Sequence, residues 1–249
     1  MTDKDSAATI STPHPLWRRL LAEFLGTALL VAVVVGSGIA AAQLSPDDVG
    51  IQLLENSMAT VFGLAILILM LGPVSGAHFN PVVTVADWFL SRRSPEGFSG
   101  DHIWPYVVVQ TAGAIAGSLL ANAMFDVGTT FSDNERASWS HLLAEVVATA
   151  GLVLLIFALV RTNRAALAAP AVGAYIGAAY WFTSSTSFAN PAVSIGRMFS
   201  DTFAGIAPTS VPAFVIAQII GAAIGVVLVV ALYPSEAHSP HTHQGETHD

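Results

Sequence analysis

Two asparagine–proline pairs, Asn80-Pro81 and Asn190-Pro191, are the residues whose type and spacing most clearly suggest chemistry. Asparagine accepts hydrogen bonds from the free N–H groups at the start of a helix, and proline at the first helical position gives up a donor that has no partner there. Each pair therefore predicts the start of a helix. Because a single pair of this kind usually marks only a turn or a cap, its meaning depends on the segment that follows.

Only about ten apolar-leaning residues follow each pair, 81–90 after the first and 191–200 after the second. At ~1.5 Å per residue, each segment makes a helix of roughly 15 Å, half the ~30 Å thickness of the hydrocarbon core of a bilayer. Two such half-helices suit a membrane only if they meet in its middle.

The composition is that of an integral membrane protein. Of the 249 residues, 53% are hydrophobic and 10% are charged, and the mean hydropathy is +0.64, whereas roughly a quarter of the residues of a soluble domain are charged. The absence of cysteine excludes disulfides and cysteine-ligated metal sites, and no cofactor is expected. The nine Lys and Arg residues form no basic patch and the net charge is −8, so nucleic acid is not an expected partner.

Six longer apolar runs match the length of a transmembrane helix. We expect spans at residues 20–42, 53–72, 103–125, 142–160, 167–182 and 212–233, with the half-helices after the second and the fifth. The predicted fold is an all-α membrane protein with six transmembrane helices and two re-entrant half-helices. This domain, residues 16–233, lies between a polar tail at 1–15 and a His-rich tail at 234–249 that we expect to be disordered.

The distribution of Lys and Arg predicts the orientation. With both termini in the cytoplasm, seven of these residues lie inside and two, Arg136 and Arg197, lie outside. Inner loops of membrane proteins carry the excess of positive charge, so this topology is favoured over its reverse.

Three short motifs occur twice, in the same order. They are Ala22-Glu23-x-x-x-Thr27 with Ala144-Glu145-x-x-x-Thr149, Asn80-Pro81 with Asn190-Pro191, and Gln110-x-x-Gly113-x-x-x-Gly117 with Gln218-x-x-Gly221-x-x-x-Gly225. Each half, 16–125 and 139–233, contains an odd number of full spans, so the second half must be inserted upside down relative to the first. Inverted repeats of this kind place the functional site at the membrane midplane.

These motifs, with the run Ser75-Gly-Ala-His-Phe-Asn80, resemble those of the aquaporin, or major intrinsic protein, family over about residues 16–233. The resemblance implies a bundle of six helices and two half-helices, a pore through each subunit and a homotetramer in the lipid bilayer.

In such a bundle, the N-termini of both half-helices aim about half an elementary positive charge each into the pore, which repels cations and protons. Asn80 and Asn190 can also direct amide donors to a passing solute, beyond capping their helices. The expected pore-lining residues are Asn80, Asn190, Pro81, Pro191, Val82 and Ala192.

Glu23 and Glu145 are ionisable residues within apolar spans, which makes them candidates for function. The resemblance implies that each accepts hydrogen bonds from the backbone of a re-entrant loop, since irregular backbone at membrane depth needs partners. Proton relay is the alternative. His78 is expected to pack within its loop, with metal binding or pH gating as alternatives.

One position departs from the family pattern. Most members carry Arg three residues after the second Asn, at the narrowest constriction, and here that residue is Val193. Arg197 lies one helical turn further on, about 6 Å nearer the outside. It either lines the outer vestibule or pairs with Asp201 on the surface, and we favour the surface pair.

Carrying the family spacing over from the two asparagines predicts a selectivity filter of Thr60, Ala178, Ser187 and Val193, with Phe62 as the alternative to Thr60. This set has neither the arginine nor the aromatic rings that narrow other members. The opening is therefore expected to be wide and only mildly polar.

The filter valine resembles that of bacterial aquaglyceroporins associated with arsenic resistance. The implied function is passive conduction of small uncharged solutes across the bacterial inner membrane: glycerol and other polyhydroxy compounds, arsenous acid, methylated arsenicals and water. Protons and ions are expected to be excluded.

Four other functions are alternatives to this channel. A water-selective aquaporin is the alternative most similar to the expected function. A secondary transporter would need ionisable groups near the midplane, where only the two asparagines are expected. A closed structural protein would carry bulky residues at the constriction. An enzyme is not expected, because the spans supply no nucleophile, base and orienting group.

The histidines of the C-terminal tail could bind a metal, but a solvated tail is the simpler interpretation.

Overall fold

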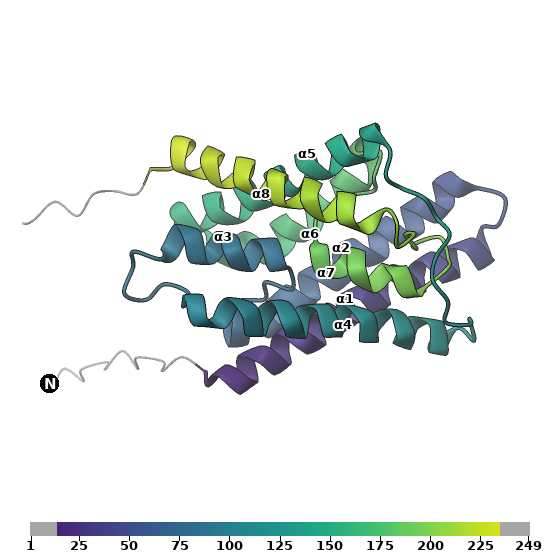
Figure 1. Cartoon of the computed structure of the whole chain (residues 1–249), viewed down its shortest axis with the longest axis horizontal. Coiled ribbons are helices and arrows are strands. Elements are labelled where there is room, and N and C mark those ends of the chain that lie inside the picture. Colours follow the sequence, from purple (N-terminus) through teal and green to yellow (C-terminus); the bar gives the residue numbers. More distant parts are fainter. Residues whose placement is uncertain (1–13, 235–249) are drawn as a thin grey trace, which may run out of the picture.

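The computed structural model describes residues 14–234, and the regular secondary structure of this part consists of eight α-helices and three short 3₁₀-helices. The expectations for the N-terminal tail and for the His-rich tail fall almost wholly on residues 1–13 and 235–249, outside the described residues. The all-α membrane fold expected from the sequence is confirmed (Figure 1).

Six helices are long and apolar enough to cross a membrane. They are α1 (Leu16–Leu44), α2 (Val49–Ser75), α4 (Ile103–Met124), α5 (Trp139–Arg161), α6 (Ala168–Phe182) and α8 (Val211–Leu232). Each coincides with an expected span, and α1 and α2 extend past it by two to four residues at each end. Short 3₁₀ turns, η1 (Gly100–His102) and η2 (Ala165–Leu167), precede α4 and α6.

The two asparagine–proline pairs start the short helices α3 (Pro81–Ser91) and α7 (Pro191–Gly196), and η3 (Arg197–Phe199) prolongs α7. Figure 1 shows α3 and α7 entering the bundle from opposite ends, and both ends of the described chain lying at the α3 side. The helix N-termini meet inside the bundle, as two half-helices must.

Close helix packing repeats between the two halves. A Cβ on Gly117 of α4 would lie 2.1 Å from the carbonyl oxygen of Ala28 in α1. At the matching place in the second half, a Cβ on Gly225 of α8 would lie 2.7 Å from the carbonyl oxygen of Ala150 in α5. Only glycine permits this approach, in which small residues bring helix backbones together.

We predict that Gly117→Val lowers the stability of the protein, because its side chain would collide with the backbone of α1. Overpacking of this kind costs about 1–3 kcal/mol. The measurement is thermal unfolding in detergent, followed by tryptophan fluorescence. Gly128→Val is the control, since a Cβ there meets nothing within 4 Å. Equal melting temperatures for the two variants would show that α1 and α4 do not pack as described.

Candidate functional site

The side chains of Asn80 and Asn190 cap the two half-helices. The Oδ1 of Asn80 accepts from the N–H of Val82 at 3.1 Å. The Oδ1 of Asn190 accepts from Ala192 at 3.0 Å and from Val193 at 3.2 Å. The acceptor oxygens of both asparagines are therefore occupied by their own helices, and only their amide hydrogens remain for other partners.

One amide hydrogen of each asparagine crosses to the other loop. The Nδ2 of Asn80 donates to the carbonyl of Ala189 at 2.8 Å, and the Nδ2 of Asn190 donates to the carbonyl of Phe79 at 2.7 Å. This reciprocal pair fastens the two half-helices tip to tip. The second hydrogen of each amide has no protein acceptor within residues 14–234, and both asparagines line the central cavity.

The loops that lead into the half-helices hold an unusual backbone. Ala77 and Phe79 have φ of 50° each, and their counterparts Ser187 and Ala189 have φ of 53° and 48°. Residues other than glycine rarely adopt this left-handed region, and each such residue costs on the order of 1–3 kcal/mol. Something else in the structure must hold these loops in place.

Glu23 supplies that restraint for the first loop. Its carboxylate is fully buried, and Oε1 accepts from the hydroxyl of Ser75 at 2.6 Å and the N–H of His78 at 3.0 Å. Its Oε2 accepts from the N–H of Phe79 at 2.7 Å and the Nε2 of Gln110 at 2.8 Å. Four donors thus surround one carboxylate, and two of them are N–H groups of the left-handed loop.

Glu145 repeats the arrangement in the second loop. Its Oε1 accepts from the hydroxyl of Ser185 at 2.6 Å and from the N–H of Phe188 at 2.9 Å. Its Oε2 accepts from the N–H of Ala189 at 2.8 Å and from the Nε2 of Gln218 at 2.7 Å. The structure therefore places both glutamates against the loops. With every carboxylate oxygen occupied, neither is positioned as a proton relay.

The glutamines and serines that share these networks are functional residues that the sequence motifs contain but that were not predicted to bond to the glutamates. Gln110 and Gln218 stood in a recognised repeat, and Ser75 and Ser185 each precede an Asn by five residues. The repeat itself was the signal that could have found them, because a buried polar residue that recurs in both halves needs a partner in both.

His78 lies beside the start of α3. Its Nδ1 is 3.1 Å from the hydroxyl of Thr84, and its Nε2 is 3.1 Å from Oδ2 of Asp87. Its ring also packs against those of Phe98 and Tyr106. The ring thus packs among its own loop, α3 and α4, and no group of three or more metal-binding side chains occurs among the described residues.

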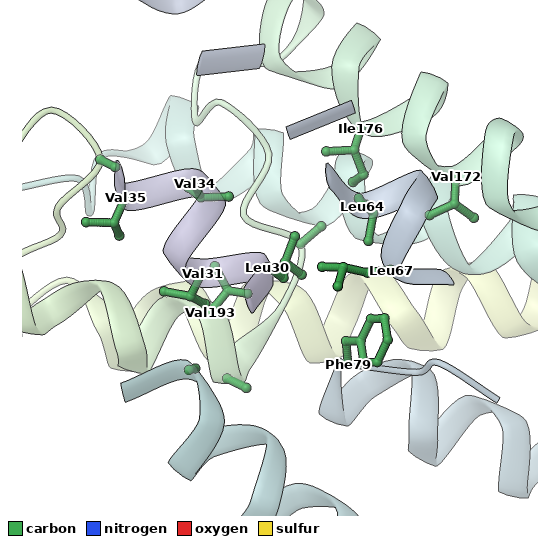
Figure 2. Close-up of a cluster of buried hydrophobic side chains, with 14 of the residues drawn as sticks. Leu30, Val31, Val34, Val35, Leu64, Leu67, Phe79, Val172, Ile176 and Val193 are labelled. Carbon is green, nitrogen blue, oxygen red and sulfur yellow. The ribbon is translucent and has the colours of Figure 1, made fainter. Parts of the chain in front are cut away.

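A cavity of ≈ 520 Å³ passes both asparagines. Asp87 and His78 line it at one end, the α3 end, and Ser187 and Arg197 line it at the other, the α7 end. Its walls are mostly apolar; Figure 2 shows several of them, Leu30 from α1, Leu64 from α2, and Val172 and Ile176 from α6. An apolar tube with few polar groups suits solutes that pass without binding tightly.

Three of the expected filter residues, Thr60, Ser187 and Val193, line this cavity. The hydroxyl of Thr60 contacts that of Tyr180 at 3.1 Å. The buried hydroxyl of Ser187 has no hydrogen-bond partner among the described residues. Phe62, the alternative to Thr60, is 61% exposed on the outside of α2, so it does not face the cavity.

The expectation for Ala178 is wrong. Ala178 is exposed and absent from the cavity wall, to which α6 contributes Val172, Ile176 and Tyr180 instead. These three residues recur every four positions and share one helix face, whereas Ala178 lies two positions from each neighbour, about 200° around the helix. The residues of α6 that line the cavity nearest to Ala178 in the sequence are Ile176 and Tyr180, two positions away on either side.

The expected surface pair of Arg197 with Asp201 is also wrong. Arg197 is 3% exposed and lines the cavity, while Asp201 accepts hydrogen bonds from the hydroxyl of Ser132 and the N–H of Asp133. An arginine and the ring of Tyr180 therefore line the α7 end. The expectation of an opening without arginine or aromatic rings fails for the same reason.

The segment between α4 and α5 folds over the α7 end. Hydrogen bonds from the hydroxyls of Thr209 and Ser210 hold the pKa of Glu135 below its usual value. Arg136 donates from Nε to the carbonyl of Gly205 at 2.7 Å, and burial lowers its pKa. These contacts fix the segment to the loop that follows α7.

We predict that Glu145→Gln destabilises the protein by about 3 kcal/mol, because its amide NH₂ would face donors and the charge that strengthened the bonds is lost. Thermal unfolding in detergent measures this. Glu55→Gln is the matched control, since Glu55 of α2 accepts one bond, from Ser45 at 3.2 Å. Equal losses in the two variants would contradict the role of Glu145.

Comparisons with known proteins agree with this geometry. The family model of the major intrinsic proteins matches residues 10–196. Aquaglyceroporin AqpS of Rhizobium meliloti is 47% identical over 86% of this chain and 89% of its own, and aquaporin AqpM of Methanothermobacter marburgensis is 31% identical over 88% and 96%. The solved aquaglyceroporin of Plasmodium falciparum shares the fold, with a TM-score of 0.62 at 20% identity over 86% of this chain and 96% of that one. The chain belongs to the major intrinsic protein family.

Proposed function

We propose that the protein is a passive channel for small uncharged solutes, namely glycerol and other polyhydroxy compounds, arsenous acid, methylated arsenicals and water. The observation that carries this proposal is the cavity that passes Asn80 and Asn190, each with an amide hydrogen left for a solute. Two relatives support glycerol as a solute, because one is named an aquaglyceroporin (AqpS) and the other, at 30% identity, is named the glycerol uptake facilitator of Pseudomonas aeruginosa.

The polar groups along the cavity suit solutes that carry several hydroxyls. Asn80 and Asn190 offer donors at the midplane, and Ser187 offers a free hydroxyl beyond them. Most of the other residues that line the cavity are aliphatic. A polyol can place its hydroxyls on the polar side and its carbon chain on the apolar side, and arsenous acid also presents three hydroxyls. Weak, repeated contacts of this kind favour conduction over binding.

A channel is favoured over a carrier because, within residues 14–234, the two fully buried carboxylates and the carboxylate that lines the cavity all have partners. Glu23 and Glu145 are each occupied by four donors, and Asp87, at the α3 end, pairs with His78. A coupled transporter needs an ionisable or ion-coordinating group that is free to change its state. The cavity itself argues against a closed structural protein.

We place the protein in a bacterial inner membrane, as a homotetramer with both termini and the α3 end in the cytoplasm. The excess of Lys and Arg in the inner loops supports this orientation. The α7 end is then extracellular.

Reconstituted protein in liposomes tests the function. Stopped-flow light scattering should show glycerol and water flux that follows the solute gradient and rises linearly to high concentration. Arsenous acid entry is measured in the same vesicles by elemental analysis. Dependence on a proton or sodium gradient would favour the carrier, and water flux without glycerol flux would favour a water-selective aquaporin.

Val193→Arg should reduce glycerol and arsenous acid flux at least tenfold and water flux less. A long guanidinium fills the lumen, and a single file of water needs less width. Ala178→Leu is the control of comparable bulk, on the side of α6 away from the cavity, and should leave glycerol flux unchanged. If the control lowers glycerol flux and Val193→Arg does not, the filter has been placed on the wrong residues.

A further inference from the structure

Two arginines converge on one aromatic ring at the α7 end. The guanidinium carbon of Arg197 lies 3.5 Å from the centre of the Phe188 ring, and that of Arg136 lies 5.4 Å from it. Phe188 directly precedes Ala189, whose carbonyl accepts the crossing bond from Asn80. The two charges are therefore tied to the same loop that forms the pore.

Backbone carbonyls, and not carboxylates, anchor both guanidinium groups. The Nε of Arg197 donates to the carbonyl of Ala204. Arg136 donates to the carbonyls of Gly205 and Phe203, at 2.7 and 3.0 Å. Neither arginine makes an ion pair within the described part of the chain. Carbonyl dipoles and a ring face stabilise a cation without cancelling its charge.

Arg197 lines the cavity one helical turn beyond Val193. Its two terminal nitrogens make no hydrogen bond to any described residue, so they are available to water or solute in the cavity. A guanidinium stays protonated at all physiological pH values. Because the side chain is 3% exposed, salt screens its charge far less than that of a surface arginine.

We propose that Arg197, reinforced by Arg136 behind Phe188, is the residue that keeps cations and hydrated protons out of the pore. This inference rests on the proposed channel function. In it, the width and the charge of the filter are set by different residues on successive turns of one half-helix: Val193 leaves room for a solute, and Arg197 supplies the positive charge.

The electrostatics at this end favour the proposal. The N-termini of α3 and α7 add only partial positive charges, deeper in the pore. Glu145 also acts on Arg197, but its oxygens already accept four hydrogen bonds from the loop and from Gln218. Asp133, Glu135 and Asp201 line a separate surface pocket together with Arg136, and none of them lines the cavity. Inside the cavity, a cation that enters from the α7 end thus meets the full positive charge of Arg197 with no carboxylate beside it in the wall.

The test compares parent protein, Arg197→Met, Arg197→Gln and Arg197→Lys in liposomes. Proton entry under an imposed potassium diffusion potential is read from an enclosed pH-sensitive dye, and glycerol flux is read by light scattering in the same preparation. The readout is the ratio of proton leak to glycerol flux. We expect this ratio to rise at least tenfold in the Met and Gln variants and to stay near the parent value in the Lys variant.

Arg92→Met is the matched control, because Arg92 also lies over a ring, 3.9 Å from Phe89, but does not line the cavity. A parent that conducts no glycerol overturns the channel function. A parent that conducts glycerol, with an unchanged ratio in the Met and Gln variants, overturns only the role of Arg197. If neither uncharged variant assembles, Arg197 is a structural clamp for residues 203–205 and the proposal is rejected.

Discussion

The structure depends on hydrogen-bond acceptors for backbone N–H groups that lie outside any helix. Two loops leave the helical state in the middle of the bundle and take up left-handed conformations at residues other than glycine. In a hydrocarbon environment their N–H groups find no water, and each unmet group would cost several kcal/mol. Glu23 and Glu145 meet this need, since each carboxylate accepts from two loop N–H groups while a serine and a glutamine complete its shell.

Once the loops are held, the crossing bonds of Asn80 and Asn190 join the two halves. Each asparagine uses its oxygen for its own helix and one hydrogen for the opposite loop, so its remaining hydrogen points to the lumen with little freedom to turn. The donors that a solute would meet are therefore fixed in advance, and a solute need not reorganise the pore in order to pass.

The two halves share the same loop and half-helix backbone, but the charged side chains at the two ends of the cavity differ. At the α3 end, the cavity wall carries a carboxylate, Asp87, whose Oδ2 lies 3.1 Å from Nε2 of His78. At the α7 end, Arg197 and Arg136 stand without a paired carboxylate within residues 14–234. An inverted repeat thus produces a symmetric scaffold whose ends are electrostatically different, because the side chains outside the repeated motifs are free to diverge.

The spans, the two half-helices, the repeat and the two glutamates could all be predicted from the amino-acid sequence. These features are local, because hydropathy, an asparagine–proline pair and a carboxylate in an apolar run each carry their meaning without knowledge of the neighbours. Which side chains line the cavity became known only from the folded arrangement of the helices. Tyr180 lines the cavity and Ala178 does not, because the rotation of α6 about its axis turns Tyr180 inward. Arg197 is buried because the segment at residues 203–205 folds back over it. Both outcomes depend on contacts between separate segments of the chain, and residue spacing within one segment does not predict such contacts.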